Sequence, residues 1–428
     1  MTLAALPALP APPELRAPRA PLYVEPLGRV DPLSEPELAR ALEHDYLVWD
    51  SFVGGERRVD LHPLVLSRAA HQAAVATAVH ASRAMDEAAA AALADPDEAA
   101  AYGFHPDVLA LARAADAAGD RGSLARVDLL WSGDGFLACE INADCPGGHN
   151  EAAALPALAR AAGYHRHHDP TTVLDDLAER LVRESGGPGS PLGDIAIVFC
   201  TAYAEDLQVC AIVERAVRRR GGRTSRMPVT ALYSVADSLF ARGRRVSVIY
   251  RYLPTEYLEG AKNAPAIARA VRAGKVRVVA SFAEMFAQSK ASFARAWALL
   301  GRERLEDVIP RTELAPAVSD DELVADRRRW VLKRALGRVG DQVFVGVLHD
   351  DDEWRAIVRA VREAEGEVWV AQRYAPQVTV GTPWGERYVT LGVYLLDGVF
   401  AGYFARLSPE SHASHEALVL PVFVEGRG

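Results

Sequence analysis

The sequence predicts a mixed α/β protein in which helical and strand-rich regions follow one another along the chain. Residues 35 to 120 have a helix-forming composition. Between residues 194 and 280, strand-like runs alternate with helical stretches, as is typical of a small parallel α/β domain. From Arg329 onward strands predominate and favour an antiparallel sheet with one interposed helix. A chain of 428 residues has room for about two or three domains.

The N-terminal part begins with a Pro- and Ala-rich segment, residues 1 to 24, which we expect to be a disordered arm. Residues 25 to 185 follow as a helical region that leads into a β-hairpin. Ser34 begins a helix in the predicted pattern, because an acidic residue and a proline follow it directly. The Ala-rich run from 85 to 102 and the segment from 151 to 163 are also predicted to be helical.

A Gly-, Ser- and Pro-rich segment, residues 184 to 193, marks the start of a second domain at residues 186 to 280. We interpret this domain as the small α/β unit that receives substrate. Its expected elements are strands at 194 to 200, 246 to 252 and 276 to 280 and helices at about 204 to 219 and 262 to 273.

The last region, residues 281 to 428, is expected to form a nucleotide-binding lobe. Ser281-Phe-Ala-Glu284 has the form of a capping box opening a helix, and this helix would carry Lys290. The remaining predicted elements are the strands WVLKRAL, QVFVGVL, EVWVAQRY, ERYVTLGVYLL and GVFAGYFARLS and a helix near 352 to 366.

Composition narrows the possible partners. The formal net charge of −9 argues against a nucleic-acid partner. No apolar run is long enough to span a bilayer, so no membrane partner is expected. The N-terminus lacks the pattern of a secretory signal, and the four cysteines form no C-x-x-C pair. We therefore expect a cytoplasmic protein with reduced thiols.

The stretch from Ala125 to Pro146, ARVDLLWSGDGFLACEINADCP, is the most informative part of the chain. Two strand-like runs flank a turn. Since alternate residues of a strand share a face, Arg126 and Asp128 should lie on one side, as should Glu140 and Asn142. Two carboxylates and an amide oxygen on one face suit Mg²⁺, which binds one or two protein carboxylates together with substrate phosphates. The alternative is the polar face of an exposed hairpin.

Spacing also predicts the register of this hairpin. A three-residue loop at 133 to 135, with Gly135 in a left-handed conformation, pairs Asp128 with Glu140. The same register pairs the arginine before this aspartate with the asparagine after this glutamate. Cys139 is expected to face away from the polar side because it alternates with Glu140.

Other basic groups occur late in the chain. Lys333 precedes the turn Gly337-Arg338-Val339-Gly340, where backbone N–H groups can approach phosphate oxygens. A plain hairpin turn is the alternative. Arg406 ends the last strong strand pattern and could hold a phosphoryl group or a carboxylate, or be a solvated arginine at a strand end. His412 and His415, in the following loop, are candidates for a general base.

Three stretches in this order resemble the glutathionylspermidine synthase family. They are the R-x-D and E-x-N-x-D-x-P block of the hairpin, the lysine with its glycine turn, and LGVYLLDGVFAGYFARLSPES. The resemblance covers roughly residues 25 to 425. It implies a circularly permuted ATP-grasp fold with an inserted small α/β, preATP-grasp-like substrate domain and an N-terminal helical region. The Cys/His amidase domain of the bifunctional members is absent from the sequence, so no amidase activity is implied.

The resemblance implies roles for single residues of the hairpin and of the last strand. Asp128, Glu140 and Asn142 match the magnesium ligands of the family, for which two Mg²⁺ ions are expected. Arg126 matches an arginine near the reacting carboxylate and phosphates. Arg406 resembles the arginine that stabilises the transferring γ-phosphoryl group.

The same resemblance implies an ATP site. Lys290 and Lys333 look like the two lysines that contact ATP, and Gln372 occupies the segment that lies along adenine. The phosphate-binding glycine loop would comprise Gly337, Arg338 and Gly340.

The function expected from this resemblance is ATP-dependent ligation of a small carboxylic acid to an amine. An acyl phosphate would be the intermediate, and ADP and phosphate would be released. A small-molecule kinase that stops after phosphoryl transfer is one alternative, and a non-catalytic nucleotide-binding protein is another. A metallohydrolase is disfavoured because it leaves Lys333 and its glycine loop without a role.

Overall fold

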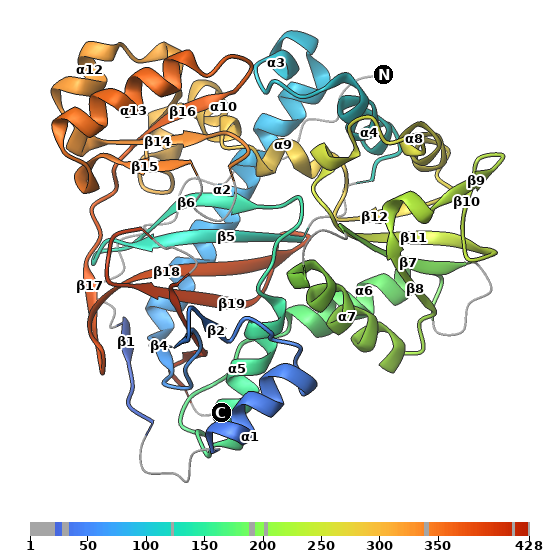
Figure 1. The fold of residues 1–428 in the computed structure, drawn as a ribbon, viewed down its shortest axis with the longest axis horizontal. Helices are drawn as coiled ribbons and strands as arrows, with labels where there is room; N and C mark the ends of the chain where they lie inside the picture. Colours follow the sequence, from blue (N-terminus) through green and yellow to red (C-terminus); the bar gives the residue numbers. More distant parts are fainter. Residues whose placement is uncertain are drawn as a thin grey trace.

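The computed structural model describes residues 22–27, 34–120, 124–187, 193–200, 204–337, 342–412 and 416–426. Within these ranges it contains three larger sheets, each covered by helices (Figure 1). The predicted mixed α/β class is confirmed. The predicted N-terminal arm lies outside the described residues up to position 21.

The central sheet has the strand order β20-β19-β18-β5-β6, with β17 paired to β18, and its described strands are antiparallel neighbours. It joins a hairpin from the first half of the chain to strands from the last quarter. Its strands are β5 (Leu124–Trp131), β6 (Phe136–Asn142), β17 (Thr379–Thr382), β18 (Gly385–Leu396), β19 (Val399–Ser408) and β20 (Leu418–Leu420).

Helices cover both faces of this sheet. On one face lies α2 (Arg68–Ala94), whose small buried alanines allow close packing on Val127 and Leu129 of β5. On the other face lie α5 (His149–Ala161) and α6 (Val173–Glu184). Because side chains alternate along β5, its even-numbered residues point away from α2.

A second sheet forms the part of the molecule at the right of Figure 1. Strands β8, β7, β11 and β12 are parallel neighbours, as predicted, and β10 and β9 add an antiparallel hairpin that the sequence analysis did not foresee. Helices α6 and α7 pack on one face, and α4 and α8 on the other. The elements are β7 (Asp194–Phe199), β8 (Thr224–Pro228), β9 (Tyr233–Val235), β10 (Ser238–Ala241), β11 (Arg244–Tyr252), β12 (Arg277–Val279), α4 (Pro106–Ala117), α7 (Ala204–Arg219) and α8 (Ala264–Arg272).

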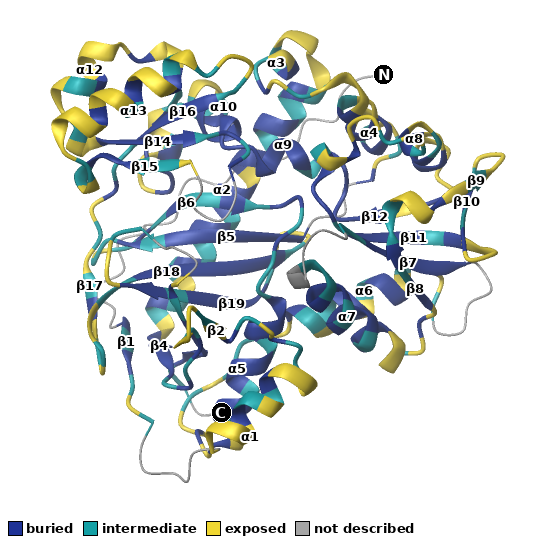
Figure 2. Cartoon of the chain, in the orientation of Figure 1, coloured by how far each residue is buried: buried dark blue, intermediate teal, exposed yellow. Residues whose placement is uncertain are grey.

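The third sheet, with the order β13-β16-β14-β15, lies above the hairpin end of the central sheet (Figure 1). The outer faces of α12 and α13 are exposed, whereas the strands beneath them are largely buried (Figure 2). The elements are β13 (Thr312–Leu314), β14 (Trp330–Arg334), β15 (Val343–Val345), β16 (Trp369–Arg373), α9 (Glu284–Gln288), α10 (Ala291–Leu300), α11 (Arg302–Leu305), α12 (Asp320–Ala325) and α13 (Asp351–Glu363).

The N-terminal region is less uniformly helical than predicted. Ser34 and Glu37 form a capping box at α1, which confirms the predicted helix start. Short strands interrupt the region because β4 lies between β1 and the C-terminal β21, a pairing that local sequence does not encode. The elements are β1 (Leu22–Val24), α1 (Glu35–Arg40), a π-helical turn (Ala41–Asp45), β2 (Phe52–Val53), β3 (Glu56–Arg57), β4 (Leu64–Leu66), α3 (Pro96–Ala100) and β21 (Val422–Val424).

Single 3₁₀ turns connect several of these elements. They are Val229–Ala231, Thr255–Leu258, Ala315–Ala317, Arg327–Arg329 and Gly346–Leu348. None of the helices in the described part of the chain is long and apolar enough to cross a lipid bilayer.

Candidate active site

The hairpin of β5 and β6 has the predicted register. Asp128 lies opposite Glu140, and Arg126 lies opposite Asn142. The arginine and both acids therefore occupy the face of the sheet that α2 does not cover.

The turn of this hairpin differs from the prediction. Trp131 pairs with Phe136, which leaves a loop of four residues rather than three. Gly133, with φ of 90°, takes the left-handed conformation that we expected of Gly135. Alone, this longer loop would shift the register by one residue. One additional residue in β6 compensates for it.

That additional residue is Cys139, which forms a β-bulge opposite Asp128 together with Glu140. Its thiol donates to the backbone carbonyl of Asp128 at 3.3 Å, and its own carbonyl accepts from Lys333 Nζ at 3.0 Å. Burial raises the pKa of the Cys139 thiol to about 11, although the charge of Lys333 lowers it. Because the bulge interrupts the alternation, the thiol lies beside the polar groups, and the expectation that it faces away is wrong.

Asp128 is almost fully buried between two arginines. Arg126 donates to it through Nε at 2.7 Å and through Nη2 at 3.0 Å, and Arg406 donates through Nη2 at 2.7 Å. The Asn142 amide lies 3.4 Å from the same carboxylate. Burial alone would lower the pKa of Arg126, but the adjacent carboxylate raises it well above its usual range. One carboxylate thus shares its charge between two guanidinium groups.

A glycine allows this arginine to lie across the sheet. Gly392 of β18 pairs with Asp128 on one side and with Phe404 on the other. A Cβ at Gly392 would lie 2.8 Å from the Arg126 Cδ and 2.9 Å from the Phe404 carbonyl. Instead, the guanidinium lies over the Phe404 ring, 5.2 Å from its centroid.

Glu140 is bound to Lys290 at 2.7 Å, and the same ammonium donates to the carbonyl of Gly337 at 2.9 Å. Burial would raise the pKa of Glu140, but Lys290 lowers it to about 2. Lys290 lies between α9 and α10, so the prediction that the helix after Ser281 carries it is wrong. Its backbone N–H donates to the Ala335 carbonyl next to β14 instead of continuing a helix.

Lys333 is held from two sides on β14. Besides its bond to the Cys139 carbonyl, its Nζ donates to Gln372 Oε1 at 2.7 Å. The Gln372 amide donates in turn to Thr312 Oγ1 at 3.0 Å. Burial lowers the pKa of Lys333, while Cys139 and Glu140 raise it. Since an ammonium has three donors, one remains for a further acceptor.

The position of the lysines is informative because the chain has only four. Lys290 and Lys333 are 3% and 7% exposed, whereas Lys262 and Lys275 are exposed. A buried ammonium is costly unless it is paired. Half of the lysines of the protein are therefore buried at one cluster.

The structure describes only some of the residues predicted for the glycine loop and for the loop after Arg406. Arg338 and Gly340 of the glycine loop and His415 lie outside the described residues. Burial lowers the pKa of His412, and Lys333 and Arg406 lower it further, which places this imidazole near the cluster.

The cluster carries more positive than negative charge. Four basic groups meet two carboxylates, Asp128 and Glu140, which leaves a surplus of two positive charges. The basic groups are Arg126, Lys290, Lys333 and Arg406. Within the described ranges no group of three or more His, Cys, Asp or Glu side chains could hold a metal ion. Two opposed carboxylates with an amide fit Mg²⁺, which completes its shell with water and phosphate oxygens.

The sequence analysis missed the buried bridge that anchors the hairpin. Asp144 accepts from Arg251 Nη2 at 2.5 Å, from Thr255 Oγ1 at 2.6 Å and from the Thr255 backbone N–H at 2.7 Å. All three residues are at most 1% exposed. Asp144 stands in the E-x-N-x-D-x-P block, but nothing local identifies β11 as its partner.

His149, at the start of α5, was also missed. The residue is fully buried, and neither ring nitrogen has a hydrogen-bond partner among the described residues. Burial, together with the charge of Arg126, lowers the pKa of His149 to about 3. The imidazole is therefore neutral in the folded protein.

This histidine predicts acid sensitivity. An unfolded His titrates near 6.5 and the folded one near 3, so the unfolded state binds more protons between these values, and stability falls as the pH drops through this window. Between pH 7 and pH 5 we expect the protein to lose about 2 kcal/mol more stability than a His149→Gln variant. Urea unfolding at both pH values measures this difference. The exposed His44→Gln should behave like the parent, and equal losses in parent and His149→Gln would contradict the assignment.

Comparison with a solved structure supports the fold. A glutathione synthetase-like effector from Globodera pallida, in its apo form, superimposes with a TM-score of 0.59 at 12% identity, covering 94% of this chain and 100% of that chain. A protein from Methylobacillus flagellatus assigned as a γ-glutamylcysteine synthetase gives a TM-score of 0.41 at 13% identity, covering 71% and 80%. Curated proteins provide no match.

A family model described as glutathionylspermidine synthase preATP-grasp matches residues 34–425, which is nearly the whole chain. The resemblance predicted from the hairpin block, the lysine with its glycine turn and the C-terminal strands is thereby confirmed. The protein belongs to the glutathionylspermidine synthase preATP-grasp family.

Proposed function

We propose that the protein is an ATP-dependent ligase that joins a carboxylic acid to an amine through an amide bond. The observation that carries this proposal is the cluster of four basic groups around two carboxylates. Its surplus positive charge complements the Mg²⁺ complex of ATP, which is a dianion. Membership of a family named for glutathionylspermidine synthase supports a bond-forming reaction between an acid and an amine.

Each basic group has a part in the proposed reaction. Lys290 and Lys333 hold phosphate oxygens, and Lys333 can do so with the donor that its bonds to Gln372 and the Cys139 carbonyl leave over. Arg406 has a buried Nε without a hydrogen-bond partner among the described residues, which gives it a donor for an anionic oxygen. These are positioning and electrostatic roles, which dominate phosphoryl transfer.

The proposed reaction has two steps. A substrate carboxylate oxygen attacks the γ-phosphorus of ATP, the bond to the β-phosphate oxygen breaks, and ADP leaves with the electron pair. Arg126 and Arg406 offset the charge on the resulting acyl phosphate. An amine then attacks the acyl carbon, the carbon–oxygen bond to phosphate breaks, and phosphate leaves. The amine loses a proton, for which His412 is the neutral base near the cluster.

Asp128, Glu140 and Asn142 would hold Mg²⁺. When bound, this ion neutralises part of the charge on the phosphates. In the structure both carboxylates are bound to basic groups, so binding of the ion requires these groups to turn toward the phosphates instead. The same basic side chains thus compensate the acids before substrate binds and the phosphates afterwards.

The proposal is tested by measuring ADP release over libraries of carboxylic acids and amines. We expect ADP only when an acid and an amine are both present, and we expect Glu140→Gln to abolish it. Asp134→Asn, an exposed acid on the same hairpin, is the matched control and should keep full activity.

Other outcomes of this assay would reject the ligase. Release of AMP would exclude the acyl-phosphate route. ADP formation without an amine, with a stable phosphorylated acid as product, would show a small-molecule kinase. Full activity of Glu140→Gln would show that the cluster is not the site.

A further inference from the structure

A second feature with ligand-binding chemistry lies on α7, and none of its residues belongs to the cluster described above. A hollow of about 420 Å³ lies between the π-helical turn, α5, α6 and α7. This volume is within the range of small-molecule pockets, about 300–1,000 Å³. Its floor is apolar and is formed by Ala157, Leu158, Leu174, Ile212 and Ala216.

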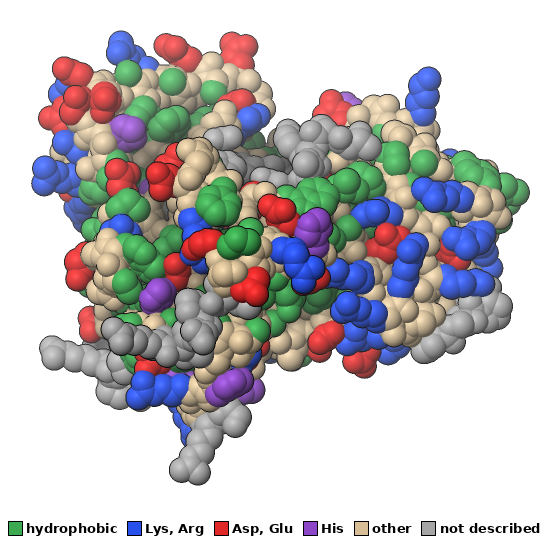
Figure 3. All heavy atoms as spheres, turned by 60° about the horizontal axis from the view of Figure 1, so that its bottom comes forward, with side chains coloured by type: hydrophobic (Ala, Val, Ile, Leu, Met, Phe, Trp, Pro, Cys, Tyr) green, Lys and Arg blue, Asp and Glu red, His purple; other side chains and the backbone are tan. Residues whose placement is uncertain are grey.

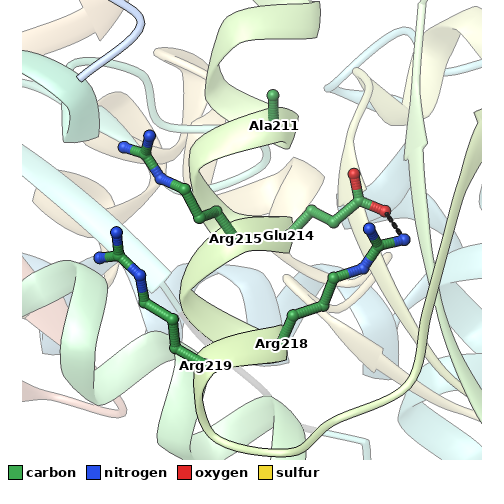
Figure 4. Close-up of a pocket in the computed structure, with 5 residues that line it drawn as sticks. All are labelled: Ala211, Glu214, Arg215, Arg218 and Arg219. Carbon is green, nitrogen blue, oxygen red and sulfur yellow. Dashed lines mark ion pairs between the residues drawn. The ribbon is translucent and has the colours of Figure 1, made fainter. Parts of the chain in front are cut away.

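Two arginines line this hollow side by side. Figure 4 draws the adjoining pocket, which Arg215 and Arg219 line together with Ala211, Glu214 and Arg218. In this view Arg215 and Arg219 are one turn apart on α7 and extend in the same direction, whereas Glu214 and Arg218 extend from another side of the helix. Arg218 is bound to Glu214 at 2.8 Å. Like charges at the spacing of Arg215 and Arg219 destabilise a helix. An anion bound between them would remove this repulsion.

Neither arginine forms an ion pair with a carboxylate among the described residues, although Asp45 also lines the hollow and its charge raises the pKa of Arg215. Arg215 donates to the backbone carbonyl of Asp45, and Arg219 is exposed. Burial lowers the pKa of Arg215, and Arg219 lowers it further. Tyr46 lines the same hollow as both arginines. Burial and Asp45 raise the pKa of its hydroxyl, while both arginines lower it.

The surroundings favour anions as well. Between Leu207 and Arg245 the chain has nine arginines against two acidic residues, although the whole protein carries a net charge of −9. Five of these arginines form ion pairs with Asp175, Asp194 or Glu214, and Arg215 and Arg219 are not among the five. Basic side chains gather over this part of the molecule in Figure 3. A local positive field of this kind attracts anionic ligands, and it also disfavours pairing with the same face of a second copy.

We propose that this hollow binds a small amphiphilic anion, a carboxylate or phosphate attached to a short apolar chain. The charged end lies between Arg215 and Arg219 and accepts from Tyr46, and the apolar chain lies on the alanine and leucine floor. Neither half suffices, because free inorganic phosphate leaves the floor hydrated and an alcohol leaves the arginines unpaired. The site is independent of the ligase reaction proposed above.

The test is isothermal titration calorimetry of the full chain with sodium octanoate, octyl phosphate, octanol and inorganic phosphate. We expect octanoate or octyl phosphate, or both, to bind at least about tenfold more tightly than octanol and inorganic phosphate. Arg219→Gln should weaken that binding at least about tenfold. Ala157→Leu, which narrows the floor, should weaken it as well.

Arg218→Gln is the matched control, since it removes the same charge from the same helix but Arg218 does not line the hollow of about 420 Å³. It should change the affinity less than about twofold. If Arg218→Gln and Arg219→Gln weaken binding equally, binding depends on the general positive charge of this surface and not on the hollow, and the proposed site is wrong. The proposal also fails if octanol binds as tightly as the anions. It fails likewise if vesicles of anionic phospholipid bind the protein while monomeric octanoate and octyl phosphate do not.

Discussion

Replacing Lys333 by methionine should lower kcat/KM for ATP by about 100- to 1,000-fold, because it removes the preorganised donor that we propose for the phosphates. The stability of the protein should change by less than about 1 kcal/mol. Burial already lowers the pKa of Lys333, so losing this charge relieves a desolvation cost. The opposing cost is the loss of a donor for Gln372 and the Cys139 carbonyl. A loss of activity without a loss of stability would show that Lys333 serves the reaction and not the fold.

The measurements are steady-state ADP release and urea unfolding of the same preparations. Lys275→Met removes an exposed lysine and should leave both unchanged. If Lys333→Met keeps its activity, Lys333 does not contact the phosphates. If it unfolds instead, the bonds of Lys333 to Gln372 within its own sheet and to the Cys139 carbonyl of the central sheet are primarily structural.

The sequence predicted the register of the hairpin but not its turn or its bulge. Alternation and spacing were enough to place Asp128 opposite Glu140. They could not show that a longer loop and a bulge at Cys139 compensate for each other, since both depend on pairing with a neighbouring strand. The bulge presents a carbonyl to Lys333, so the irregularity that sequence could not reveal is part of what positions the lysine.

The long-range contacts were similarly hidden. Gln372 has a side chain bound to Lys333, a contact between neighbouring strands that a resemblance to known sites did not assign. His149 could not be recognised as buried and unpartnered, because a helix start with a polar residue usually faces solvent. Sequence periodicity predicts helices, strands and their buried faces. The contacts of Gln372 and the burial of His149 depend instead on which of these elements pack together in the fold.

The link between the central sheet and the parallel sheet shows how the candidate site is positioned. The hairpin strand β6 ends at Asn142, and two residues later Asp144 binds Arg251 and Thr255 at the end of β11. Arg251 also donates to the carbonyl of Leu253. It donates as well to the carbonyls of Ala280 and Ser281, which lie in the segment that leads to Lys290. One buried arginine thus connects the acidic hairpin, the parallel sheet and the lysine that binds Glu140.

Removing Asp144 should therefore destabilise the protein by about 3–5 kcal/mol in Asp144→Ala, the cost of leaving one partner of a buried pair uncompensated. Arg251 keeps its backbone acceptors but loses its counter-charge, and the Thr255 N–H loses its acceptor. Asp144→Asn retains an oxygen for that N–H and should cost less. Urea unfolding measures these differences, with Asp134→Ala, an exposed acid of the same hairpin, as the control that should stay within about 0.5 kcal/mol of the parent. A loss below about 1 kcal/mol in Asp144→Ala would mean that the bridge does not hold the two sheets together. The hairpin would then be positioned by its other contacts, such as the pairing of β5 with β18 and the bonds from the Ala143 and Asp144 backbone N–H groups to Gln288.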